Sequence, residues 1–330
     1  MEMAQRHFGS RPAENRSEWF DGRTNGLMIS FTVLFCALAI ASETFLSGYT
    51  MFVLSRQVAF YILIALAQAF CLVVGGMNLS VGAIGSIATV VLGLCLERWH
   101  LTPAVAALAA LACGGLAGLL NGVLITRLAI DSFIVTLSMM FIFMGLRSGI
   151  SGGQPYAVPE SFTWIGQHTL FGVPWVFIIA VLALAAVAHV FRNTVFGRHL
   201  LATGGNKQAA YLSGVNTDGV IVRANALSGF FAALAAVLWA SQLGSAAPET
   251  GDNWLIVSFA VAIIGGTALS GGAISPFGLF LGAAIFMLIK HGLVEVKANP
   301  YFANAFLGLL ILLAIAVDRV REVYSRRVVA

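Results

Sequence analysis

Long, repeated apolar runs are the feature of this sequence that most restricts its possible folds. Most of them measure about 17–23 residues, the length that an α-helix needs to cross roughly 30 Å of hydrocarbon at about 1.5 Å per residue. The sequence therefore predicts an all-α, polytopic membrane protein with about ten transmembrane helices. The predicted spans are residues 27–42, 52–74, 81–96, 103–126, 132–149, 171–190, 221–243, 254–270, 276–290 and 302–317.

The composition agrees with lipid-facing helices and excludes a soluble globular protein. Apolar residues make up 59% of the chain, charged residues make up only 10%, and the mean hydropathy is +0.91. About a quarter of the residues in a soluble domain are charged, so this chain has too few charges to cover an aqueous surface. The 35 glycines also suit membrane helices, because small residues let helix backbones approach closely.

The distribution of lysine and arginine predicts the orientation of the chain. With ten spans and an inside N-terminus, 13 of the 18 basic residues fall in cytoplasmic segments. This asymmetry follows the positive-inside rule, so both termini are expected in the cytoplasm. The predicted organisation is a disordered cytoplasmic tail (1–25), one transmembrane domain (26–318) and a basic cytoplasmic tail (319–330). The five basic residues expected outside are Arg56, Arg98, Arg147, Lys290 and Lys297.

A ten-residue segment occurs twice, at a constant offset of 190 residues. Gly75–Ile84 and Gly265–Ile274 are identical at seven of ten positions. Each copy begins with a Gly-Gly pair, which disfavours a continuous helix, and transporters use such breaks where unwound backbone lines a cavity. We therefore predict two broken or re-entrant helices. The alternative is an ordinary turn between spans. The span count puts both copies on one side, while the symmetry of the repeat, parallel or inverted, stays open. The predicted breaks are Gly75, Gly76, Gly265 and Gly266.

Motifs for catalysis and nucleotide binding are absent from the sequence. It contains no G-x-x-x-x-G-K-[ST] loop, no H-E-x-x-H, no G-x-S-x-G and no metal-ligand spacing. The predicted spans also hold almost no charge, whereas ion-coupled carriers need buried ionisable residues to relay protons or sodium. The chain is therefore predicted not to be an enzyme, to hold no cofactor or metal itself, and to take its energy from a partner.

Several blocks of the sequence together resemble one family of permeases. Residues 75–82 (GGMNLSVG) are similar to its GG-[I/M]-[D/N]-L-S-V-G signature, and residues 121–122 with 133–137 are similar to its next block. Residues 194–215 resemble its main cytoplasmic loop. Over about 52–318, the chain thus resembles the permeases of ABC sugar importers of the ribose/xylose/galactoside type, in the superfamily of branched-chain amino acid and monosaccharide permeases.

The resemblance implies a complex and a mechanism. A second permease subunit, as a homodimer or heterodimer, would complete the path. A cytoplasmic ABC ATPase would bind ATP and Mg²⁺ and drive alternating access, and an extracytoplasmic sugar-binding protein would deliver a small neutral sugar. The chain would then lie in the bacterial inner membrane, with no nucleic acid among its partners.

The cytoplasmic loop at about 191–220 would be the segment that docks into the ATPase. A short helix is predicted from Lys207 to Ser213, with small residues that can seat in a groove and basic residues that can pair with an acidic rim. The alternative is a solvated basic loop that only obeys the positive-inside rule. The candidate coupling residues are Gly197, Arg198, Gly204, Gly205, Asn206, Lys207, Ala209 and Ala210.

Polar residues within the spans are the candidates for lining the path of a neutral, hydroxyl-rich solute. Each of them can equally make a hydrogen bond between helices. Two positions depart from the family pattern, since Asn78 stands where many members have Asp, and Asp131 stands where the family often has Pro. Asp131 is expected to cap the helix that begins near Ser132. The candidate path residues are Gln68, Asn78, Ser80, Thr136 and Ser270.

Two alternative functions stand beside the sugar importer. The first is an importer of the same architecture for a nucleoside, a polyol or a branched-chain amino acid. A zwitterionic amino acid would favour helix N-termini or charges at the site. The second is a stand-alone secondary carrier or an intramembrane enzyme, which would need ionisable residues within the spans.

Overall fold

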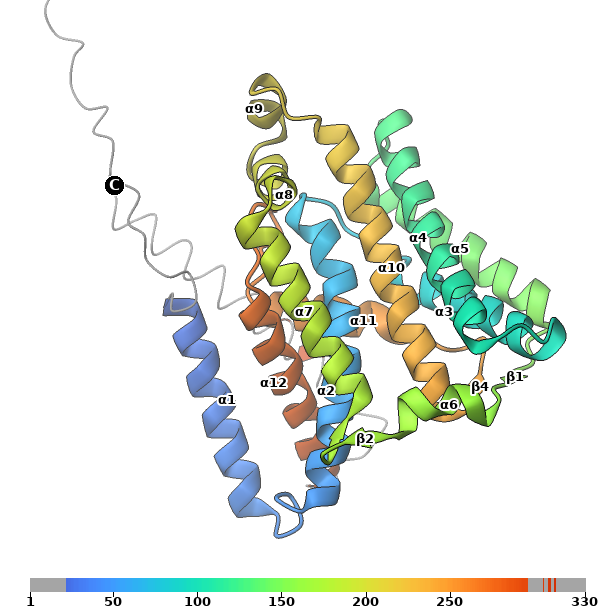
Figure 1. Ribbon diagram of the computed structural model, residues 1–330. Coiled ribbons are helices and arrows are strands. Elements are labelled where there is room, and N and C mark those ends of the chain that lie inside the picture. The colour runs from blue at the N-terminus through green and yellow to red at the C-terminus, as the bar shows by residue number, and fades with distance from the viewer. Residues whose placement is uncertain (1–21, 296–304, 306–307, 310–311, 313–330) are drawn as a thin grey trace, which may run out of the picture.

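The computed structural model describes residues 22–295 and the isolated positions 305, 308, 309 and 312. In this part of the chain the protein is a bundle of α-helices with four two-residue strands (Figure 1). Eight helices are long and apolar enough to cross a membrane, which confirms the all-α, polytopic prediction. These helices are α1 (Gly22–Ala41), α2 (Gly48–Val73), α3 (Val81–Gly93) with its π-helical extension η2 (Leu94–Arg98), α4 (Pro103–Arg127), α5 (Ser132–Ser151), α7 (Trp175–Asn193), α10 (Thr217–Leu243) and α12 (Pro276–Glu295).

The two ends of the bundle carry different short elements (Figure 1). Helix α6 and the antiparallel pair β2–β3 lie at one end, and helices α8 and α9 lie at the opposite end. Strands β1 and β4 pair antiparallel and join the chain before α6 to the chain after α10. The short elements are β1 (Tyr156–Ala157), α6 (Glu160–Gln167), β2 (Thr169–Leu170), β3 (Val173–Pro174), α8 (Val195–Gly205), α9 (Lys207–Leu212), β4 (Ser245–Ala246) and α11 (Trp254–Ile264).

The predicted spans correspond to helices with one correction. The span predicted at 254–270 is too long, because α11 ends at Ile264 and has only 11 residues. At about 1.5 Å per residue it covers roughly half of the hydrocarbon thickness. The tenth predicted span, 302–317, lies outside the described residues except for isolated positions. The predicted tails also lie outside them, except for residues 22–25, which begin α1.

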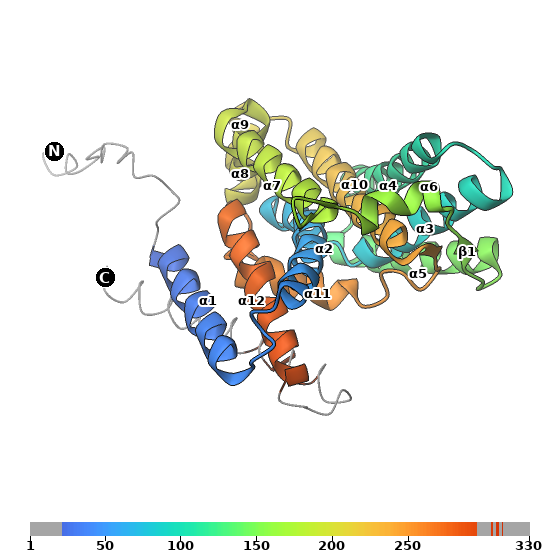
Figure 2. The ribbon, with the colours of Figure 1, turned by 60° about the horizontal axis from the view of Figure 1, so that its bottom comes forward.

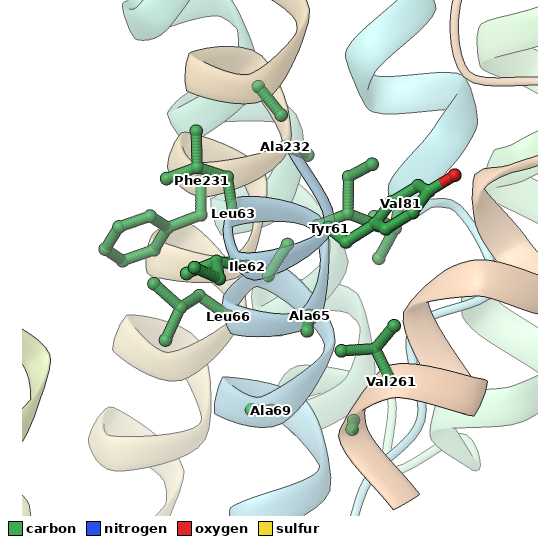
Figure 3. Close-up of a cluster of buried hydrophobic side chains, with 14 of the residues drawn as sticks. Tyr61, Ile62, Leu63, Ala65, Leu66, Ala69, Val81, Phe231, Ala232 and Val261 are labelled. Carbon is green, nitrogen blue, oxygen red and sulfur yellow. The ribbon is translucent and has the colours of Figure 1, made fainter. Parts of the chain in front are cut away.

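Helix α2 forms the centre of the bundle. It is apolar on every side, which is typical of a helix surrounded by other helices, and it is buried over residues 58–73. Helices α7, α10, α11 and α12 pack around it. Figure 3 shows part of this core, where Phe231 of α10, Val81 of α3 and Val261 of α11 lie around the side chains of α2.

Helix α1 lies at the edge of the bundle and packs against α12 (Figures 1 and 2). Most of its surface is open, and its exposed side chains include Ile29, Val33 and Ile40. Exposed apolar side chains of this kind suit contact with lipid or with another membrane helix. The fold therefore places the most buried helix, α2, directly after the most exposed one.

Glycines bring α4 and α10 into backbone contact. A Cβ atom on Gly118 would overlap the carbonyl oxygen of Asn225, and one on Gly114 would lie 2.6 Å from the carbonyl oxygen of Gly229. Such small residues at every fourth position let membrane helices approach closely. This contact fixes α10 beside α4, so polar residues on both helices can reach the first helix break.

The structure breaks the helices at both Gly-Gly pairs, as predicted. Residues 74–80 separate α2 from α3, and residues 265–275 separate α11 from α12. Gly75 and Gly266 have φ angles of +78° and +81°, in the left-handed region that favours glycine. The breaks lie together, since the backbone of Gly271 is next to that of Gly75. The two breaks therefore meet beside α8, whose Gly204 lies against both Val73 and Gly272.

Candidate functional site

The first break enters the interior of the bundle instead of forming an exposed turn. Two of its backbone N–H groups donate to hydroxyl groups of α5. The N–H of Met77 donates to Ser132 Oγ, and the N–H of Leu79 donates to Thr136 Oγ1, both at 3.1 Å. Asp131 caps the start of α5, as predicted. Unwound backbone persists inside a membrane bundle only when neighbours satisfy it in this way.

Asn78 is the centre of a buried polar network on this break. Its Nδ2 donates to Ser228 Oγ of α10 at 2.9 Å. Its Oδ1 accepts from the N–H of Ser80 at 2.9 Å and from Ser80 Oγ at 2.7 Å. Asn121 of α4 then donates to Ser80 Oγ at 2.8 Å. All four side chains are buried, so the neutral amide gives both a donor and an acceptor without burying a charge.

The five candidate path residues lie in different environments. Asn78, Ser80 and Thr136 come together on the first break, where each makes hydrogen bonds between segments. Ser270 lies apart from them and is exposed on the second break. Gln68 is fully buried in α2. The structure therefore brings three of the five residues into one site.

Gln68 is unusual because its hydrogen-bonding groups are free. Within the described residues, neither Oε1 nor Nε2 has a partner, although the side chain is fully buried. An unsatisfied buried polar group costs about 1–3 kcal/mol, so an amide kept here without a partner needs an explanation other than stability. Of the four candidate path residues that are buried, Gln68 is the one whose donor and acceptor both lack a partner among the described residues.

Arg147 is a buried charge whose environment the sequence analysis did not predict. It was expected among the basic residues of the outer segments, and the structure places it within α5, where it is only 7% exposed. Its Nη1 donates to Ser86 Oγ at 2.8 Å, to the carbonyl oxygen of Pro248 at 2.6 Å and to Asp252 Oδ1 at 2.5 Å. The spans are therefore not free of ionic interactions. The side chain remains in the bundle because Asp252 neutralises it and three acceptors surround one nitrogen.

The segment 247–253, which precedes α11, packs against the first turns of α3 beside this ion pair. Ser86 Oγ lies 2.5 Å from the carbonyl oxygen of Thr250, and the backbones of Gly82 and Gly251 are in contact. A Cβ atom on Gly85 would lie 2.6 Å from the ring of Trp254. Arg147 and these contacts hold the connection between α10 and α11 against the helix that follows the first break.

The loop at 191–220 is almost entirely helical. Helix α9 confirms the short helix predicted at Lys207–Ser213, and Asn206 caps it by accepting from the N–H of Ala209 at 2.9 Å. Helix α8 was not predicted. Its start is capped by Thr194, whose hydroxyl oxygen accepts from the N–H of Gly197 at 3.1 Å. Local hydroxyl and amide caps thus turn a glycine-rich connection into two short helices.

The eight candidate coupling residues divide into an exposed set and a packed set. Gly197 and Ala210 are buried, and Gly204 packs against other backbone. Lys207 forms an ion pair with Asp218 of α10 at 3.1 Å, with both side chains largely exposed, so it contributes little to stability. The exposed set is Arg198, Gly205, Asn206, Lys207 and Ala209.

Two residues on α9 were missed by the sequence interpretation. Tyr211 is 66% exposed and Leu212 is 76% exposed, next to the exposed set. Large exposed apolar side chains outside the apolar spans are typical of an interaction surface. Their position directly after Ala209 and Ala210, in the segment predicted to dock, is the signal that could have identified them.

These features define the class of the protein: a polytopic membrane permease with two broken helices and a helical loop at one end. The chain belongs to the family described as branched-chain amino acid transport system / permease component, which matches residues 50–315. It is therefore the permease component of a transport system and not itself an enzyme.

Characterised relatives cover most of the chain. It is 32% identical to the ribose import permease of Bacillus subtilis over 312 residues, which are 93% of this chain and 96% of the relative. It is 31% identical to the fructose import permease of Rhizobium meliloti (85% and 80%) and to the galactose/methyl galactoside import permease of Salmonella typhimurium (92% and 96%). No solved structure matches the chain.

Proposed function

We propose that this chain is the membrane-spanning subunit of an ATP-driven ABC importer for a monosaccharide, which it translocates by alternating access. The observation that carries the proposal is the similarity of 85–93% of the chain to permeases named for ribose, fructose and galactose import. The unwound segment 74–80 supports it, because its buried residues Asn78 and Ser80 bond to α10 and α4 and its backbone bonds to α5, and transporters hold solutes where helices break inside the bundle.

The importer would contain three further kinds of subunit. A second permease subunit would complete the path, and an extracytoplasmic sugar-binding protein would deliver the solute. A cytoplasmic ABC ATPase would bind ATP and Mg²⁺ and dock on α8 and α9. The exposed side chains of these helices support this assignment, because Tyr211 and Leu212 of α9 offer apolar contact area and Arg198 of α8 offers a basic group.

The charges and the free polar groups favour a neutral solute. Arg147 and Asp252 pair with each other, so neither is a free counter-ion for a charged solute. Among the described residues, neither the donor nor the acceptor of Gln68 has a partner, and this pair suits a hydroxyl group, since a hydroxyl both donates and accepts. We assign Gln68 to the path as the residue that hydrogen-bonds the sugar when the bundle opens beside the first break.

The first prediction concerns transport by the assembled importer. Proteoliposomes that contain the chain with its ATPase, supplied with the binding protein and ATP, are expected to accumulate labelled ribose, fructose or galactose. The measurement is uptake of each sugar, with leucine and a nucleoside as comparison solutes. The chain reconstituted alone is expected to show no uptake. Uptake by the chain alone, or uptake of leucine without any sugar, would contradict the proposal.

The second prediction concerns orientation. We place the protein in the bacterial inner membrane with α8 and α9 in the cytoplasm. In a background without the four native cysteines, Lys207→Cys is expected to react with a membrane-impermeant maleimide only after the membrane is opened. Phe171→Cys is the matched control, because Phe171 is 97% exposed in the turn between β2 and β3 at the opposite end. Labelling of position 207 in intact cells would overturn this orientation.

A further inference from the structure

The end of α8 meets both helix breaks at one point. The N–H of Gly272, in the second break, donates to the carbonyl oxygen of Val73, the last residue of α2, at 2.9 Å. Gly204 of α8 packs directly on this hydrogen bond, and Gly271 lies between Gly204 and Gly75. We name these five residues, Val73, Gly75, Gly204, Gly271 and Gly272, the glycine junction.

Backbone contact in the glycine junction leaves no room for side chains. A Cβ atom on Gly204 would overlap the carbonyl oxygen of Val73 and lie 2.6 Å from the nitrogen of Gly272. A Cβ atom on Gly271 would lie 2.7 Å from the carbonyl oxygen of Gly204 and 2.9 Å from the nitrogen of Gly75. Three segments that are distant in sequence therefore touch through rigid backbone, without flexible side chains between them.

The hydrogen bond at the centre of the junction gives a partner to a carbonyl group at the C-terminal end of α2. The last carbonyl groups of a helix have no partner within the helix. For Val73 that partner comes from the other copy of the repeat, through Gly272. The second break is thus hydrogen-bonded to the residue that precedes the first break, and Gly204 of α8 packs on this hydrogen bond.

We propose that the glycine junction transmits movement of α8 and α9 directly to both helix breaks, with Gly204 as the positioning residue. This inference rests on the proposed coupling role of the loop. When α8 moves, Gly204 displaces Val73 and Gly272 together, because close-packed backbone transmits displacement instead of absorbing it. The break that carries Asn78 starts directly after Val73, so the buried polar network and the second break respond as one unit.

The test compares two additions of one methyl group in the assembled importer. Gly204→Ala puts the methyl into the junction, whereas Gly115→Ala puts it on α4 where a Cβ atom meets open space. Gly204→Ala is expected to lower the sugar transported per ATP hydrolysed by about tenfold, while the ATPase rate and the binding of the ATPase stay within about twofold. Gly115→Ala is expected to leave both quantities unchanged. Ala209→Trp, on the exposed face, is expected instead to weaken binding of the ATPase.

A second measurement leaves the glycines intact and so does not depend on the folding of Gly204→Ala. Spin labels are placed at Ala202 of α8 and Leu269 of the second break, both exposed, in the cysteine-free importer. Their separation is expected to stay constant between the nucleotide-free and the vanadate-trapped importer. The separation between Ala202 and Arg127, at the exposed end of α4, is expected to change.

The outcomes separate this inference from the proposed function. If the unmodified importer transports sugar and Gly204→Ala couples normally, or if the separation between positions 202 and 269 changes during the cycle, the junction does not act as one unit. If neither spin-label pair changes while sugar is transported, α8 does not move and the coupling role of the loop is overturned as well. If the unmodified importer takes up no sugar, the proposed function fails, whatever the variants do.

Discussion

Replacing Arg147 with methionine is expected to cost about 2–3 kcal/mol of unfolding free energy, because a buried guanidinium with three acceptors is lost. Removing one partner of a buried ion pair typically costs about 3–5 kcal/mol. The value here is lower because the Asp252 side chain is 40% exposed and water can hydrate its carboxylate. The connection between α10 and α11 is expected to loosen from α3. Unfolding in a denaturing detergent, followed by circular dichroism, measures the change.

Arg127→Met is the matched control for this prediction. Arg127 ends α4 and is exposed, so its replacement is expected to change the free energy by less than about 0.5 kcal/mol. Adding Asp252→Ala to Arg147→Met is expected to cost less than the sum of the single changes, since the two residues share one interaction. Equal effects of Arg147→Met and Arg127→Met would show that the ion pair does not hold the segment.

Replacing Asn78 with leucine is expected to have the other large effect, a loss of about 3 kcal/mol or more together with loss of transport. The change leaves the N–H and hydroxyl of Ser80 and the hydroxyl of Ser228 without their partner inside the bundle. Each buried polar group that loses its partner costs about 1–3 kcal/mol. Unfolding in detergent and sugar uptake by the assembled importer measure the two effects.

Two variants test whether the hydrogen bonds of Asn78 cause this loss. Asn78→Asp keeps the acceptor for Ser80, and Ser228 can turn its hydroxyl to donate, so a smaller loss is expected. Asn193→Leu makes the same change as Asn78→Leu at the exposed end of α7 and is expected to cost less than about 0.5 kcal/mol. If Asn78→Leu were as stable as Asn193→Leu, the network would not hold the break.

The helices and their breaks could be predicted because the signals are local. Most of the apolar runs are long enough to identify a membrane helix by themselves, and an α-helix satisfies all of its backbone hydrogen bonds within hydrocarbon. The Gly-Gly pairs disfavour helix within their own segment, and the structure interrupts the helix at both pairs. Asp131 caps α5 through an amide two residues away, so that prediction needed no tertiary information.

The contents of the site could not be predicted in the same way. Asn78 and Ser228 are 150 positions apart, and Arg147 and Asp252 are 105 positions apart. Whether such residues meet depends on which helices are neighbours and how each is rotated about its axis. The span count gives neither the neighbours nor the rotation of a helix, so the burial of Arg147 and its pairing with Asp252 were not predicted.

The loop at 191–220 has some features that the sequence predicts and others that only the tertiary structure shows. Its basic residues and its short second helix follow from the sequence. Its small residues suggested a surface for a partner. Gly204, however, packs against the backbone of Val73 and Gly272 of the same chain, whereas Gly205, one residue later, is exposed. Only the three-dimensional arrangement separates the two glycines, since adjacent helical residues face different directions.

The sequence by itself determined that this protein is a helical membrane bundle with broken helices, because hydrophobic length and glycine pairs act within one segment. The tertiary structure decided that the first break is buried in a polar network, that Arg147 lies inside the bundle, and that α8 touches both breaks. These features arise from contacts between segments far apart in the chain, and such contacts exist only once the helices have packed.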